Sequence, residues 1–106
     1  MRVLFDQGTP VPLRQAPAGH AVSTAYELGW ATLKNGDLLR SAEEQGFEVL
    51  VTTDTNLRYQ QNLAARRIAV VVLSTTSWPR IRLVAEQVAS AVNAAAMGSY
   101  TEVAVP

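Results

Sequence analysis

Three aspartates stand where a carboxylate can do chemistry. Asp6 directly follows the apolar run 2–5, Asp54 directly follows the β-branched run 48–53, and Asp37 opens a helix-like segment after Asn35-Gly36. In a parallel sheet, the carboxyl ends of the strands and the starts of the following helices share one edge, and neighbouring strands lie about 4.8 Å apart. Close carboxylates repel one another, and a hard divalent cation such as Mg²⁺ or Mn²⁺ relieves that repulsion. The spacing therefore predicts a metal site that holds Mg²⁺ or Mn²⁺ and acts on a phosphodiester.

Polar residues near this edge are candidates for contacting a substrate. Asn56 lies two residues past Asp54, Arg58 lies one helical turn past it, and Ser74 opens a hydroxyl-rich turn after the run 68–73. Each candidate also has a structural interpretation: an aspartate or asparagine can cap a helix, an arginine can lie on a solvated face, and serines are common in turns. The convergence of the three acids favours the functional interpretation.

The elements that would position these side chains alternate between strand and helix. Strands are predicted at 2–5, 20–25, 48–53, 68–73 and 101–105, with short helices at 9–15, capped by Thr9, and at 55–61. A longer helix should run from Asn35 towards Gly46, and the longest should begin at Trp78 and end by Gly98. This alternation predicts an α/β fold: a Rossmann-like, three-layer α/β/α sandwich around a mostly parallel sheet of four to five strands, in the order 2-1-3-4-5.

The composition of the chain excludes several classes of protein function. The chain has 106 residues, of which 48% are hydrophobic, and we expect one domain over 1–106. It has no cysteine and a single histidine, which excludes thiol catalysis and cysteine-ligated zinc. The net charge of zero argues against a large nucleic-acid surface but leaves room for an enzyme that grips a few phosphates. With no apolar run long enough to cross a bilayer and no signal peptide, we expect a soluble cytoplasmic protein without membrane contact.

In order and spacing, residues 1–75 resemble the PIN-like domains, a superfamily of metal-dependent ribonucleases, and especially its small stand-alone members. The matching segments are Val3-Leu4-Phe5-Asp6-Gln7-Gly8, Gly19-His20-Ala21-Val22, Asn35-Gly36-Asp37-Leu38-Leu39 and Thr52-Thr53-Asp54-Thr55-Asn56. The resemblance implies that Asp6, Asp37 and Asp54 bind Mg²⁺ or Mn²⁺ for the cleavage of RNA. It also implies a homo-oligomer and, since many members are toxins, an antitoxin protein as partner. Asn56 departs from the pattern, because many relatives have a fourth acid there.

The sequence leads to two other candidate functions. A catalytically weak or inactive PIN-like module for binding or dimerisation is favoured by the zero net charge and by Asn56. A phospho-acceptor domain of receiver type is excluded. The pattern of such domains has paired acids after the first strand and a lysine after the fifth. Here Asp6 stands alone, and the one lysine is Lys34.

Overall fold

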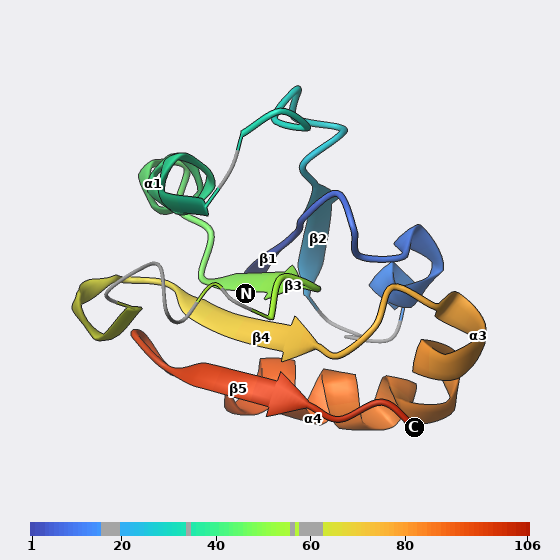
Figure 1. Ribbon diagram of the computed structural model, residues 1–106. Coiled ribbons are helices and arrows are strands. Elements are labelled where there is room, and N and C mark those ends of the chain that lie inside the picture. Colours follow the sequence, from blue (N-terminus) through green and yellow to red (C-terminus); the bar gives the residue numbers. More distant parts are fainter. Residues whose placement is uncertain (16–19, 34, 56, 58–62) are drawn as a thin grey trace.

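The fold is organised around a five-stranded, all-parallel β-sheet. In the computed structural model, which describes residues 1–15, 20–33, 35–55, 57 and 63–106, the strand order is β2-β1-β3-β4-β5. This confirms the α/β class and the predicted strand order. The strands are β1 (Arg2–Phe5), β2 (Ala21–Thr24), β3 (Val49–Thr52), β4 (Ala69–Leu73) and β5 (Tyr100–Val103) (Figure 1).

Burial along the strands follows their place in the sheet. Every residue of β3 and β4 is buried, as the continuous β-branched runs predict for inner strands of a parallel sheet. The edge strand β2 begins exposed at Ala21 and becomes buried at Thr24. The register pairs Phe5 of β1 with Thr24 on one side and with Val51 on the other, so these three strands end at nearly the same level.

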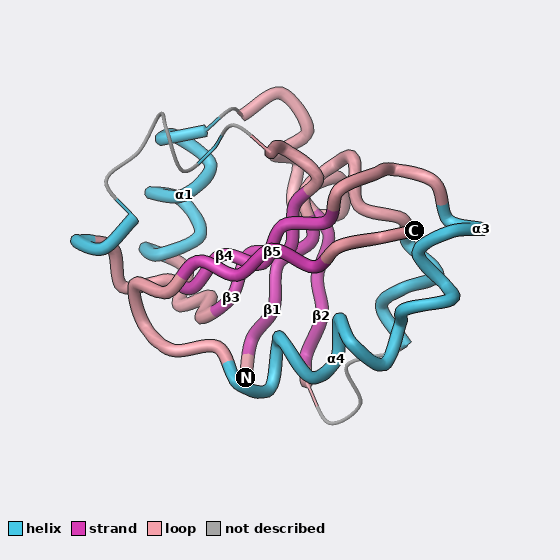
Figure 2. Tube along the Cα trace, turned by 60° about the horizontal axis from the view of Figure 1, so that its bottom comes forward, coloured by secondary structure: helices cyan, strands magenta, loops and turns pink. Residues whose placement is uncertain are grey.

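Helices lie on both sides of the sheet. The helix α1 (Asn35–Glu44) lies on one side, and α4 (Ala85–Ala94) lies on the other, as both views show (Figures 1 and 2). Each side has its own hydrophobic cluster. Leu39 and Ala42 of α1 pack with Leu50 and Val70, whereas Val88 of α4 packs with residues that include Val51. Alternate residues along the strands thus pack into opposite cores, because successive side chains of a strand point to opposite faces of the sheet.

Shorter helical segments complete the described chain. They are the 3-10 helices η1 (Val11–Gln15), η2 (Leu63–Ala65) and η3 (Arg82–Val84), and the helix α3 (Trp78–Ile81). Within the described ranges, no helix is long and apolar enough to cross a membrane.

The helix predicted from Trp78 differs in detail from the structure. The segment from Trp78 is not one helix, because η3 separates α3 from α4 where Val84 adopts φ −119° and ψ 22°. Its apolar face is still continuous: Ile81, Val88 and Val92 are buried in the same core. The helix predicted at 55–61 lies largely outside the described residues. By contrast, Gly46 follows α1 as predicted, and its φ of +81° explains the need for glycine at this position.

Candidate functional site

A pocket of about 330 Å³ opens at the carboxyl edge of the sheet. Asp6, directly after β1, and Asp54, two residues after β3, both line it. The loop after β2 and the start of α1 contribute half of the remaining lining. The full lining is Asp6, Gln7, Gly8, Ala25, Trp30, Ala31, Leu33, Leu38, Leu50, Thr52, Asp54 and Leu57.

Three groups of the chain hold the carboxylate of Asp6. The backbone N–H of Gly8 donates to Oδ1 over 3.1 Å, and the hydroxyl of Thr52 donates to Oδ2. The hydroxyl of Thr9 lies 3.1 Å from Oδ1 and 2.8 Å from the carbonyl oxygen of Val51, and its single proton serves one acceptor at a time. Thr9 was predicted to cap a helix; its hydroxyl instead contacts Asp6 and β3.

Thr52 connects the two acids. It is the last residue of β3 and is only 1% exposed. Its hydroxyl oxygen accepts a hydrogen bond of 3.1 Å from the backbone N–H of Asp54 while it donates to Asp6. The positions of both acids therefore depend on one buried hydroxyl.

The environment of Asp6 disfavours its charged form. Burial raises the pKa of its carboxyl above the ordinary value, and the negative charge of Asp54 raises it further. The hydrogen bonds from Thr52, Thr9 and Gly8 lower the pKa but do not cancel the effect of burial. A bound cation would lower the free-energy cost of burying the charged carboxylate, because it replaces the hydration that the carboxylate has lost.

Gly8 is required by close packing beside Asp6. A Cβ atom at this position would lie 2.5 Å from the hydroxyl oxygen of Thr53, closer than such atoms approach in proteins. Any other residue at position 8 would force the Thr53 hydroxyl to move. The glycine of the Asp6-Gln7-Gly8 turn therefore serves the geometry of the site.

Part of the pocket lining is apolar, and the Trp30 ring in it has an aromatic neighbour. Trp30 lies edge-on to the ring of Phe47, with 6.2 Å between ring centroids and 76° between the planes. The guanidinium of Arg2 lies 4.4 Å from the centroid of the Phe47 ring. Leu38, Leu50 and Leu57 continue the apolar lining. The pocket thus combines two carboxylates with several apolar side chains in one lining, as sites that bind organic ligands often do.

Two other predicted site residues, Asp37 and Ser74, do not line this pocket. The side chain of Asp37 is 66% exposed, pairs with Arg40 over 3.1 Å and does not line the pocket, although Leu38 beside it does. Ser74 accepts a 3.0 Å hydrogen bond from the N–H of Val105 and lines a separate pocket next to β5. Asn56 and Arg58 lie outside the described residues. The described part of the chain brings no three acidic or histidine side chains together in a group that could hold a metal ion.

The threonines around Asp6 were not predicted to belong to the site. Thr9, Thr24 and Thr52 are the buried polar residues of the described chain, with exposed fractions of 4%, 6% and 1%. A hydroxyl at the end of an otherwise apolar strand is the signal that marks Thr52 in the sequence. Its partner, 46 residues away, is visible only in the structure.

Comparison with known proteins adds no relative: no protein-family model, curated protein or solved structure matches this chain. Its function is therefore inferred from the residues and contacts described above.

Proposed function

We propose that the protein is a metal-dependent endoribonuclease of PIN-like type with a three-layer α/β/α fold. The observation that carries this proposal is the pair Asp6 and Asp54, which line one pocket at the carboxyl edge of a parallel sheet. This edge is where ligands bind in open α/β sheets. The order of the short motifs around both acids supports the same assignment.

The donor set fits a hard divalent cation. Mg²⁺ usually takes one or two carboxylates from a protein and completes its shell with water and substrate phosphates. Asp6 and Asp54 supply two carboxylates, and an ionised carboxylate has about four acceptor positions, so the three donors around Asp6 leave capacity for a cation. When bound, Mg²⁺ or Mn²⁺ would activate water and stabilise the charge of a phosphodiester under attack.

The chain's own groups have distinct tasks in this proposal. Thr52 and Gly8 hold the Asp6 carboxylate in one orientation, and Thr52 also holds the backbone of Asp54. Trp30, Leu38 and Leu50 supply apolar surface within the same lining. In this proposal Asp37 contributes less to holding the cation, because its side chain is exposed and paired with Arg40.

Cleavage of single-stranded RNA in the presence of Mn²⁺ tests the proposal. We expect Asp6→Asn and Asp54→Asn to lose most of the activity, and Thr52→Val to lose roughly ten- to a hundred-fold, as is typical when a group that orients a metal ligand is removed. Asp37→Asn should lose less. Thr101→Val on β5 is the matched control for Thr52→Val and should cleave like wild type. Equal cleavage by wild type and both aspartate variants would refute the proposal.

A non-catalytic PIN-like module for binding or dimerisation is the second candidate. The observation that favours it is the exposed ion pair of Asp37 with Arg40, which leaves two acids in the pocket rather than three. Titration calorimetry separates the two candidates. If Mn²⁺ at millimolar concentration produces no binding heat and RNA stays intact, the module is the better description.

A further inference from the structure

A second pocket of about 280 Å³ adjoins the first. Asp6 and Gln7 line both pockets, so the two meet at the proposed catalytic carboxylate. Its walls come from the segment before and within η1, the end of β2 and the turn that follows. The lining is Asp6, Gln7, Thr9, Val11, Arg14, Thr24, Tyr26 and Glu27.

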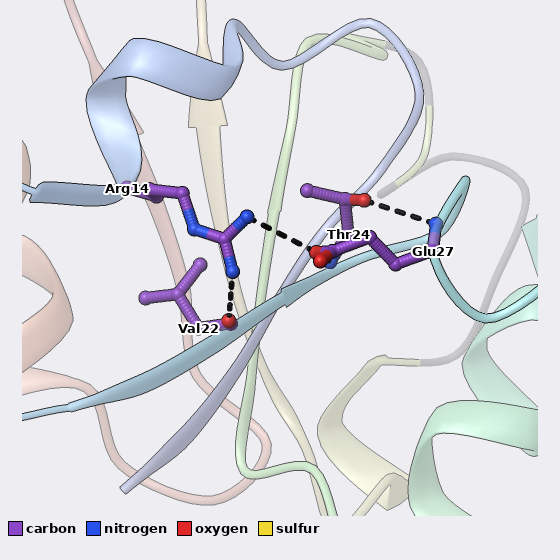
Figure 3. Close-up of polar contacts among 4 residues, drawn as sticks. All are labelled: Arg14, Val22, Thr24 and Glu27. Atoms are coloured by element: carbon purple, nitrogen blue, oxygen red, sulfur yellow. Dashed lines mark hydrogen bonds and ion pairs between the residues drawn. The ribbon is translucent and has the colours of Figure 1, made fainter.

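Hydrogen bonds between its walls preform this pocket (Figure 3). Arg14 reaches from η1 to β2, donating to the carbonyl of Val22 over 2.8 Å, and pairs with the carboxylate of Glu27 over 3.2 Å. Glu27 Oε1 also accepts the N–H of Thr24 over 3.0 Å, and the Thr24 hydroxyl accepts the N–H of Glu27 over 3.1 Å. The turn after β2 is thereby tied both to its own strand and to η1.

The charges of this pocket suit an uncharged ligand that donates hydrogen bonds. The guanidinium of Arg14 is already balanced by Glu27. The N–H of Thr24 is the main cause that lowers the pKa of the Glu27 carboxyl, so that group is ionised at neutral pH. With Asp6 added, acids outnumber bases in the lining, which disfavours a phosphate at this position.

An exposed aromatic ring is part of the lining of the pocket. Tyr26 is 77% exposed and Val11 is 54% exposed, although both are large hydrophobic side chains. An exposed aromatic ring beside hydrogen-bond acceptors is the combination with which proteins bind unpaired bases, stacking the base and contacting its edge.

We propose that the second pocket binds an unpaired nucleobase next to the phosphate that lies at Asp6, stacked on Tyr26 with an amino group directed to Glu27. This inference rests on the proposed function, because a chain with a phosphate at Asp6 presents one nucleoside to each pocket. A base held in this way must leave its helical stack. The protein should therefore prefer single-stranded RNA over duplex RNA, and an amino-bearing base over uracil, at this position.

Titration with two mononucleotides tests the base site without requiring cleavage. CMP and UMP differ at the base edge, where cytosine carries an amino group and uracil a carbonyl group. In solution with Mg²⁺, which would offset the carboxylate charges beside the phosphate of CMP, we expect millimolar CMP to shift the NMR signals of the Gln7, Thr24 and Glu27 amides, and UMP to bind more weakly. Tyr26→Ala should weaken CMP binding by roughly five- to a hundred-fold, the range typical of one lost stacking contact.

Matched variants make this result specific. Tyr26→Phe keeps the ring and should bind CMP like wild type. Leu28→Ala changes a 38% exposed residue of the same loop that does not line the pocket, and it should also bind like wild type. The base site is refuted if Tyr26→Ala binds CMP as wild type does, if CMP and UMP bind equally, or if no signal of the three amides moves.

These measurements distinguish a wrong base site from a wrong nuclease assignment. If RNA stays intact while CMP binds in a Tyr26-dependent way, the nuclease is wrong and the base site stands. If RNA is cleaved but Tyr26→Ala changes neither CMP binding nor the cleavage of single-stranded RNA, the nuclease stands and the base site is wrong.

Discussion

Asp6 is held by backbone and hydroxyl donors that come from its own turn and from β3. These donors favour the ionised carboxylate, whereas burial and the charge of Asp54 disfavour it, and burial has the largest effect on its pKa. This carboxylate has a raised pKa, and both of its oxygens accept hydrogen bonds. Such a combination is typical of a functional site rather than of a simple turn. The hydrogen bond from Gly8 alone would be an ordinary turn contact.

The raised pKa of Asp6 predicts that its charge destabilises the folded protein at neutral pH. In the unfolded chain the carboxyl ionises at lower pH, so the stability associated with protonated Asp6 is present at low pH and is lost as pH rises through its folded pKa. Asp6→Asn removes the charge and keeps an acceptor for Gly8. We expect this variant to have a higher free energy of unfolding than wild type at about pH 7, with the difference shrinking towards about pH 3.

Urea denaturation at several pH values measures this difference. Asp37→Asn is the control, because Asp37 is exposed and its variant should follow wild type closely. If Asp6→Asn is less stable than wild type at every pH, the hydrogen bonds outweigh burial and the assigned direction is wrong. A stable Asp6→Asn protein would also show that its expected loss of RNA cleavage does not come from unfolding.

At the scale of elements, one side chain of α1 ties this helix to the segment that leads into β4. Glu43 Oε1 accepts from the guanidinium of Arg66 over 2.7 Å, and Oε2 accepts from the backbone N–H of Arg67 over 2.8 Å. Burial raises the pKa of this carboxyl, but the hydrogen bonds and charges of the two arginines prevail and lower it. The contact therefore stabilises the protein at neutral pH.

Glu43→Gln should lower the free energy of unfolding by about 1 kcal/mol at neutral pH, since it weakens two hydrogen bonds to a charged acceptor. A lowered folded pKa means that this stability is present at neutral pH and is lost as pH falls through that pKa. The difference between wild type and variant should accordingly shrink in acid. Denaturant unfolding at about pH 7 and about pH 3 measures it. A difference that stays constant across this range would contradict the role of the Glu43 charge.

The zero net charge matters at the scale of the whole molecule. With nine basic and nine acidic residues, the protein has no overall excess of cations with which to displace counterions from RNA. Under the proposed function, the affinity for RNA would come from a few local contacts, namely the two pockets that share Asp6 and a bound cation. This combination suits a small site on a single strand rather than a long nucleic-acid groove.

The affinity for single-stranded RNA should therefore depend weakly on salt. We expect a plot of log K against log salt concentration with a slope shallower than about −2, because each phosphate contact on a single strand adds about −0.7. Fluorescence anisotropy with a labelled RNA and the Asp54→Asn variant, which should not cleave it, gives the slope. A slope of about −5 would show that the protein engages many phosphates and would contradict the local mode of binding.

The sequence by itself determined the α/β class, the order of the parallel strands and the edge that carries Asp6 and Asp54. Continuous β-branched runs specify inner parallel strands, and the carboxyl ends of such strands always share one edge. Only the tertiary structure decided that Thr52 joins the two acids, that Asp37 pairs with Arg40 outside the pocket lining, and that Ser74 lines a different pocket. These outcomes depend on side-chain directions and on contacts between residues up to 46 positions apart, which local patterns do not encode.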